Sequence, residues 1–230
     1  MGFSTTKNKI AAMFSAPEDR TGSGETGRCE FAHGVDKISR TAIIHLATRI
    51  NAKRYLEIGV RDGRNLRKIY IDHKEGVDPA DDSAASHRMT SDEYFAAHGD
   101  QKFDIIFIDG LHLEAQVAQD IENALSCLNE GGYIVLHDCN PPTEFHQREN
   151  YEVDGKFPPW NGTGWRAWLR FRATRPDLSM QVVDTDYGVG VLTRGRQQTI
   201  PTSDISYSDF AGARNELLPL ISVKKFLSTY

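Results

Sequence analysis

Cysteine is scarce in this chain of 230 residues, which contains only Cys29, Cys127 and Cys139. Their odd number and wide spacing argue against a disulfide framework and against a zinc site built from paired cysteines. The chain also lacks an apolar run close to the roughly 18 residues that a membrane span needs. Its first twenty residues lack the apolar core of a signal peptide. We therefore expect a soluble protein of a reducing compartment, the cytoplasm.

The sequence also has no excess of basic residues, with 27 Lys and Arg against 32 Asp and Glu and a formal net charge of -5. A broad positive surface is therefore not expected, and neither nucleic acid nor an anionic membrane is a predicted partner. The length suits a single α/β domain. We divide the chain into a Gly-, Ser- and Thr-rich arm or lid at residues 1–36 and one domain at residues 37–230.

Helix-like and strand-like segments alternate along the predicted domain. Apolar residues at helical spacing over 37–52 are followed by a buried strand at 54–60, a short helix from Gly63, and a strand that ends at Asp78. Further strands are predicted at 102–110 and 133–138, with a helix between them. The remaining segments are a helix at 164–173, two strands over 178–194 that are joined at Asp186–Gly188, and a helical segment at 208–227 that Pro219 interrupts.

This alternation predicts a Rossmann-like, doubly wound α/β fold, with a mostly parallel sheet and a C-terminal hairpin that adds an antiparallel strand at one side. Ligands bind outside the carboxyl ends of the strands in such sheets. Asp109 and His112 follow one strand of this sheet, and His137 and Asp138 follow the next. Because sequential strands are commonly neighbours, we expect these polar side chains to lie close together.

The stretch LEIGVRDGRN follows the first predicted strand and carries Glu57, Gly59 and Gly63. Glycines at this turn allow a ligand to approach the backbone, and free N–H groups at a helix start favour a carboxylate or phosphate. Asp78, at the end of the second strand, suits the hydroxyls of a ribose. The pattern is E-x-G-x-x-x-G rather than the G-x-G-x-x-G of dinucleotide sites. Glu57 would repel a phosphate but suits an ammonium group, which favours S-adenosylmethionine (SAM) over NAD.

With these motifs, residues 37–195 resemble class I SAM-dependent methyltransferases. FDIIFIDGLHLEAQVAQDIENALSCLNEGGYIVLHD is similar to the fourth and fifth strands of small-molecule O-methyltransferases, nearest to the methyltransferase-domain group related to macrocin-type sugar enzymes and more distantly to the catechol type. The resemblance implies that the cofactor is bound by Glu57, Gly59, Gly63, Asn65, Asp78, Ser91, Asp92 and Asp109. In that set Asp78 takes the ribose, and Ser91 and Asp92 border the adenine.

Methyl transfer requires the acceptor to be positioned and deprotonated. His112 stands where the catechol type has a basic lysine, and imidazole is a suitable base near neutral pH. Asp109 and Asp138 offer oxygen ligands for Mg²⁺ or Mn²⁺, whereas His137 would favour Mn²⁺, Fe²⁺ or Zn²⁺. The catechol type has an amide ligand after the second acid. Cys139 stands there in this chain, so Asn140 is the alternative ligand if the loop turns early.

Simpler interpretations compete with these roles. Asp109 and His112 could serve only the start of the following helix, and His137 could be a hydrogen-bonded strand histidine. Trp160, Trp165 and Trp168, with Arg166 and Arg170, could form an acceptor wall, but the packing of an amphipathic helix is the favoured reading.

We therefore predict a SAM-dependent methyltransferase that acts on a small-molecule acceptor, at a sugar or natural-product hydroxyl, with metal assistance left open. The arm and the loop at about 140–163 would close over the acceptor. The alternatives are an NAD(P)-dependent oxidoreductase and a non-catalytic binding module with the same fold. A homodimer formed through the C-terminal apolar segment is a further option.

Overall fold

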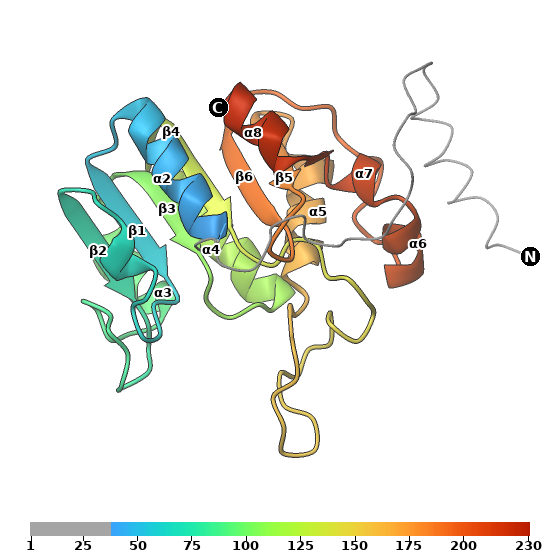
Figure 1. Cartoon of the computed structure of the whole chain (residues 1–230), viewed down its shortest axis with the longest axis horizontal. Coiled ribbons are helices and arrows are strands. Elements are labelled where there is room, and N and C mark those ends of the chain that lie inside the picture. The colour runs from blue at the N-terminus through green and yellow to red at the C-terminus, as the bar shows by residue number, and fades with distance from the viewer. Residues whose placement is uncertain (1–37) are drawn as a thin grey trace, which may run out of the picture.

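The computed structural model describes residues 38–230, and their side chains from residue 41 onward (Figure 1). The arm expected at residues 1–36 lies outside the described residues. The strands are β1 Arg54–Ile58, β2 His73–Val77, β3 Phe103–Ile108, β4 Leu128–Leu136, β5 Leu178–Val183, β6 Val189–Arg194 and β7 Leu220–Ile221. The helices are α2 Ile38–Ile50, the 3-10 turn η1 Leu66–Lys68, α3 Ser91–His98, α4 Glu114–Cys127, α5 Gly164–Thr174, α6 Tyr207–Gly212, α7 Arg214–Leu217 and α8 Val223–Thr229.

The described strands form one sheet in the order β2-β1-β3-β4-β6-β5-β7. β1 to β4 pair in parallel, whereas β6 is antiparallel to both of its neighbours. The predicted Rossmann-like, mostly parallel α/β fold is thereby confirmed. The hairpin lies at one side of the sheet, beyond β4, as predicted. β6 lies inside the sheet, because the crossover through α5 places β5 one strand away from β4 and β6 fills the space between them.

Side chains of alternate direction along each strand build a core on both faces of the sheet. On one face, Tyr55, Ile105, Phe107 and Val135 pack with α2 and α8. On the other face, Leu56, Ile106, Ile108, Ile134 and Leu136 pack with α3, α4 and α5. The near-continuous apolar strands of the sequence are explained by this double coverage, and their polar groups are confined to the strand ends.

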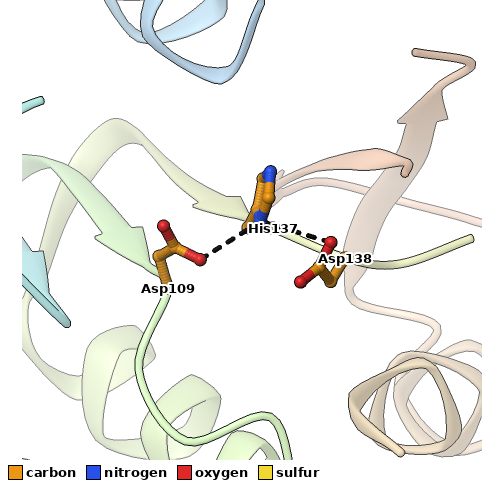
Figure 2. Close-up of side chains that lie close together, drawn as sticks. All are labelled: Asp109, His137 and Asp138. Carbon is orange, nitrogen blue, oxygen red and sulfur yellow. Dashed lines mark ion pairs between the residues drawn. The ribbon is translucent and has the colours of Figure 1, made fainter. Parts of the chain in front are cut away.

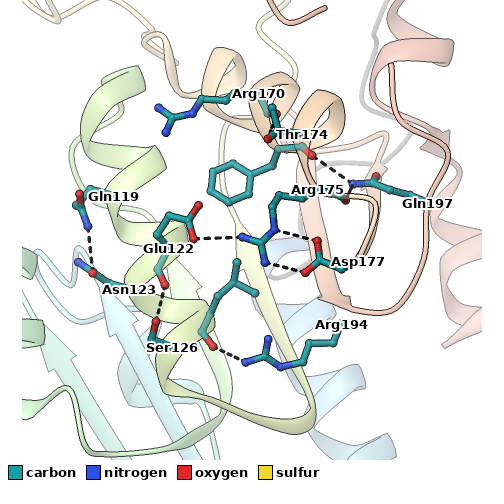
Figure 3. A network of polar contacts seen from close by, with 12 residues as sticks. Gln119, Glu122, Asn123, Ser126, Arg170, Thr174, Arg175, Asp177, Arg194 and Gln197 are labelled. Atoms are coloured by element: carbon teal, nitrogen blue, oxygen red, sulfur yellow. Dashed lines mark hydrogen bonds and ion pairs between the residues drawn. The ribbon is translucent and has the colours of Figure 1, made fainter. Parts of the chain in front are cut away.

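A polar network on the surface fixes α5 against α4 and the β5–β6 hairpin (Figure 3). The Arg175 guanidinium, just after α5, forms ion pairs with Glu122 of α4 at 3.2 Å and with Asp177 at 2.8 Å. Arg194 of β6 donates to the backbone carbonyl of Leu125 at 2.6 Å. Exposed pairs of this kind contribute little stability singly, but together they join α4 to the segment after α5 and to β6.

Three boundaries differ from the sequence prediction. The helix expected from Gly63 is only the turn η1, and the Lys74 ammonium donates to the carbonyls of Leu66 and Ile69 at 2.9 and 3.0 Å. β4 begins at Leu128, with an irregular register before residue 133, where Gly131 has a φ of +73°. The C-terminal segment is divided around Pro219, as predicted, but includes the short strand β7. Among the described helices, none has the length and apolar character needed to cross a bilayer.

Candidate active site at the carboxyl edge of the sheet

The ends of β3 and β4 bring three ligand-capable side chains together (Figure 2). Asp109 and His137 continue the parallel ladder, since their backbone N–H groups donate to Ile58 O at 2.8 Å and Ile108 O at 3.1 Å. His137 Nδ1 lies 3.1 Å from Asp109 Oδ1 and 3.3 Å from Asp138 Oδ1. The ligand atoms of the three residues all lie within 4.8 Å of one another. The proximity that strand order predicted for Asp109 and Asp138 is therefore present.

His112 joins this cluster from the turn before α4. Its Nδ1 is 3.3 Å from Asp138 Oδ2, and its Nε2 is 3.5 Å from Asp109 Oδ1. Its backbone carbonyl accepts hydrogen bonds from Thr163 N at 2.8 Å and Gly164 N at 3.0 Å. Gly162 has a φ of +65°, and a Cβ there would lie 2.2 Å from the same carbonyl. The segment before α5 is thus packed against His112 so closely that position 162 requires glycine.

His137 contacts a third carboxylate through its other ring nitrogen. Nε2 lies 3.3 Å from Oδ2 of Asp186, which is in the turn between β5 and β6. This contact is an ion pair rather than a well-aligned hydrogen bond. Burial disfavours the charged imidazolium, but Asp109 and Asp138 outweigh burial and raise the pKa of His137 well above its usual value. The sequence identified Asp186 only as a turn residue, and no local pattern predicted its contact with His137.

An amide occupies the site, but it is not the amide that the sequence suggested. Asn161 is 1% exposed, and its Nδ2 donates to Asp138 Oδ1 at 2.6 Å. The predicted alternative ligand, Asn140, is wrong: its Nδ2 contacts Asp184 at 3.4 Å and its Oδ1 accepts from Arg214. The chain after Asp138 does not turn early, because Cys139 N and Asn140 N pair with carbonyls of the β5–β6 turn at 3.0 and 2.7 Å.

The first strand ends beside this cluster. Gly59 has a φ of +86°, and a Cβ there would lie 2.1 Å from the backbone oxygen of Asp109. From the sequence, this glycine was predicted to let a ligand approach the backbone. The structure gives a second reason for it, since the backbone at the end of β3 leaves no room for a Cβ. Buried Glu57 accepts hydrogen bonds from Tyr55 Oη at 2.6 Å and Asn65 Nδ2 at 2.8 Å. The motif residues Glu57 and Asn65 are therefore in direct contact.

Asp78 and Gly63 lie on the β1 and β2 side of the same edge. The Asp78 carboxylate accepts from Arg61 N at 2.7 Å and Ala80 N at 2.9 Å, which fixes its orientation at the end of β2. Gly63 has a φ of +71° and donates its N–H to Val60 O at 2.9 Å. A left-handed residue at this turn explains the glycine of the motif.

Ser91 and Asp92 begin α3, where Thr90 and Glu93 form a capping box. Gln116 Nε2 of α4 donates to Ser91 Oγ and Asp92 Oδ1, both at 3.1 Å, and to Asp120 Oδ1 at 3.2 Å. Burial is the main cause that raises the pKa of Asp120 to about 6, with hydrogen bonds from Ser91 and Gln116 opposing it. Gln116 and Asp120 were not predicted from the sequence, because only the folded structure places their helix, α4, beside α3.

The three tryptophans have different environments. Trp165 and Trp168 are fully buried, and Arg166 stacks on Trp165 at 4.5 Å, so for these residues the packing interpretation is confirmed. Trp160 is half-buried, and its ring meets the ring of His112 edge-on at a centroid distance of 5.4 Å. It stands near the end of the loop that projects from the sheet edge (Figure 1).

Arg148 organises that projecting loop. Its guanidinium donates to the carbonyls of Phe145, Tyr151, Pro158 and Pro159 at 2.9 to 3.1 Å. Trp160 Nε1 in turn donates to the Arg148 carbonyl at 2.6 Å. The loop therefore has a defined internal structure, and it holds the Trp160 ring beside His112.

Comparisons with known proteins agree with this architecture. Residues 29–139 match the family model of a methyltransferase domain. No curated protein sequence matches the chain significantly. Among solved structures, a cofactor-bound protein from MTB, Rv0187, is 16% identical, with 73% of this chain and 85% of that chain covered and a TM-score of 0.52. A protein from Klebsiella pneumoniae assigned to the O-methyltransferases is 18% identical, with 71% and 83% covered and a TM-score of 0.51.

A third similar structure is the O-methyltransferase TomG from Streptomyces achromogenes in complex with SAM, which is 16% identical, with 70% and 81% covered and a TM-score of 0.50. At these identities the likeness concerns the fold, which is that of the class I methyltransferases. The chain is therefore similar to the class I SAM-dependent methyltransferases in its fold and over residues 29–139, which the methyltransferase-domain model matches.

Proposed function

We propose that this protein transfers the methyl group of SAM to a hydroxyl oxygen of a small-molecule acceptor, with His112 as the base. The main support is the position of the His112 imidazole, within 3.3 and 3.5 Å of the carboxylates at two adjacent strand ends. It lies on the edge where ligands bind in open α/β sheets. Trp160, half-buried beside it, offers an apolar ring face to an acceptor.

The cofactor half of the proposed site has one role for each polar strand end. The buried Glu57 carboxylate, held by Asn65, would take the ammonium group of the methionine part. Asp78 would bind the ribose hydroxyls, and Ser91 and Asp92 would border the adenine. The backbone at Gly59 and Asp109 lies between these groups and His112, which would place the sulfonium methyl next to the acceptor oxygen.

The chemical step is an in-line displacement. The bond from the methyl carbon to sulfur breaks as the bond from the acceptor oxygen forms, and S-adenosylhomocysteine leaves. His112 Nε2 takes the hydroxyl proton, because it is the ring nitrogen that is held more loosely, at 3.5 Å from its carboxylate neighbour. The contact of Nδ1 with Asp138 would orient the ring and stabilise the imidazolium that forms.

The donor set of Asp109, His137 and Asp138 fits a divalent cation. Neighbouring ligands of an octahedral ion with bonds of about 2.1 Å lie about 3.0 Å apart. The observed separations from His137 Nδ1 to the two carboxylates are 3.1 and 3.3 Å. These three residues would hold the ion, and a bound ion would stabilise negative charge on the acceptor oxygen.

The NAD(P)-dependent alternative is weakened by Glu57. This carboxylate is 1% exposed and lies beneath the turn where a dinucleotide would place its pyrophosphate. The non-catalytic alternative makes a separate prediction, namely SAM binding without turnover. A small-molecule acceptor, a cytoplasmic location and a homodimer stay predictions for this chain.

The test compares wild type with His112→Gln and with a matched control, His73→Gln, in which the exposed His73 begins β2 at the opposite edge of the sheet. Calorimetric titration with SAM, with NAD⁺ run alongside, gives cofactor binding. Release of S-adenosylhomocysteine over a panel of glycosides and phenols gives turnover. We expect the SAM Kd of His112→Gln to stay within about twofold and its kcat to fall about 10²- to 10⁴-fold.

Unchanged turnover in His112→Gln would remove the base assignment. Absence of saturable SAM binding to wild type would refute the methyltransferase proposal itself, and SAM binding with no turnover on any acceptor would favour the binding module.

A further inference from the structure

The His137 imidazole lies among three carboxylates that come from three different segments. Nδ1 faces Asp109 and Asp138 at 3.1 and 3.3 Å, and Nε2 faces Asp186 at 3.3 Å. A neutral imidazole carries one N–H and one lone pair. With protons on both nitrogens the ring faces a carboxylate on each side, and when a cation takes the place of the Nδ1 proton the remaining N–H is on Nε2, toward Asp186. The cation then lies between Nδ1 and the oxygens of Asp109 and Asp138.

The position of Asp186 is rigidly determined. Asp186, Tyr187 and Gly188 all have positive φ angles, of 46°, 60° and 90°. The carbonyls of Tyr187 and Gly188 accept hydrogen bonds from the backbone of Asn140 and Cys139, which directly follow the cluster. Strained residues of this kind persist where the surroundings fix them, often at functional sites. The turn therefore sets Asp186 against His137 rather than leaving it to solvent.

A second polar group at the same place points to a ligand. Asn161 is 1% exposed and donates through Nδ2 to Asp138 Oδ1 at 2.6 Å. The Oδ1 of this amide is buried and has no hydrogen-bond partner in the described part of the chain. Leaving a buried amide oxygen without a partner is unfavourable, and a cation or its bound water next to Asp138 would satisfy it.

We propose that Asp186 is a positioning residue that makes His137 a nitrogen ligand, through Nδ1, for a divalent transition-metal ion shared with Asp109 and Asp138. The inference rests on the proposed function for the existence of a cation at this site and adds its selectivity. Ligating histidines commonly donate their second N–H to a carboxylate, which orients the ring and strengthens it as a ligand. Carboxylate oxygens suit both Mn²⁺ and Mg²⁺, whereas an imidazole nitrogen suits transition metals. The nitrogen ligand is therefore what makes the site select Mn²⁺, a transition metal, over Mg²⁺.

The experiment measures Mn²⁺ and Mg²⁺ affinity by calorimetry in the absence of SAM and acceptor. We expect Asp186→Ala to weaken Mn²⁺ binding about 10- to 100-fold and to lower the preference for Mn²⁺ over Mg²⁺. Asp186→Asn should fall between wild type and Asp186→Ala, since it keeps a polar group of the same shape beside Nε2 but loses the negative charge. Asp100→Ala, an exposed acid just after α3, is the matched control and should leave both affinities unchanged. Thermal melting of each variant checks folding, and Asp186→Asn serves if Asp186→Ala does not fold.

A double-mutant cycle tells whether Asp186 acts by positioning His137 or by a general effect on the structure. In a His137→Glu background the side chain of residue 137 has no ring N–H for Asp186 to orient. Adding Asp186→Ala to that background should therefore change the Mn²⁺ Kd by less than about twofold. The proposal is overturned by an equal loss in both backgrounds, by no loss in Asp186→Ala alone, or by absence of Mn²⁺ binding to wild type. SAM titration of the same samples distinguishes the two proposals. If wild type binds SAM and turns over but the Asp186 variants keep the wild-type Mn²⁺ affinity, the methyltransferase proposal stands and the role of Asp186 is refuted. If the variants change Mn²⁺ affinity as expected but wild type does not bind SAM, the role of Asp186 stands and the methyltransferase proposal is refuted.

Discussion

Asp120 should make the stability of the protein depend on pH in a direction opposite to that of most carboxylates. It lies on α4, is 1% exposed and contacts Gln116 at 3.2 Å. Its pKa is raised to about 6, chiefly by burial, and the charge of Asp92 adds to the shift. An unfolded aspartate has a pKa of about 3.9. As pH rises from about 4 to 6, the unfolded state therefore releases this proton first, and unfolding becomes more favourable.

The magnitude follows from the shift. A difference of about 2 pKa units corresponds to about 3 kcal/mol, at 1.36 kcal/mol per unit, and that cost is complete above pH 6. Asp120→Asn removes the ionisation while keeping an oxygen that accepts from Gln116. The variant should therefore be about 2–3 kcal/mol more stable than wild type at pH 7.5, and the difference should vanish near pH 4.

Urea unfolding of both proteins at pH 4, 5, 6 and 7.5 measures this difference. Asp100→Asn, an exposed acid, controls for the change in net charge. Other titrating groups are the same in both proteins, so they cancel in the difference. A stability gain that is the same at every pH would refute the argument, because it would show that ionisation of Asp120 is not what the substitution relieves. A loss at pH 7.5 would refute it more strongly.

Two further predictions concern the framework of the site. Gly59→Ala should lower stability by about 2 kcal/mol or more, because φ is +86° and the new Cβ would lie 2.1 Å from Asp109 O; a melting temperature equal to that of wild type would contradict this. Arg214 donates to Asn140, to Pro141 O at 2.8 Å and to Tyr207 Oη at 2.7 Å. These contacts hold the start of the loop that carries Trp160, so Arg214→Ala should raise the acceptor KM severalfold with a smaller change in kcat. Arg214→Lys should restore little, because lysine lacks the planar fork. Wild-type steady-state kinetics in both variants would show that Arg214 does not position this loop for the acceptor.

The sheet could be predicted because its strands are nearly continuous apolar runs that end abruptly in polar residues. That pattern is local, and it requires both faces to be covered. The hairpin turn at Asp186–Gly188 was also legible from its residues. The place of β6 between β4 and β5 was not, because pairing between segments some fifty residues apart depends on the crossover through α5.

Within the candidate site, the amino-acid sequence by itself determined which strand ends carry chemistry: Asp109 and His112 after β3, and His137 and Asp138 after β4. Adjacent parallel strands end at one edge, so those residues had to meet. Only the tertiary structure decided that Asp186 lies behind His137, that Asn161 rather than Asn140 reaches Asp138, and that Asp120 lies beside Ser91 and Asp92. The physical reason is that each of these residues comes from a loop or helix whose own sequence gives no sign of the neighbour that folding brings to it.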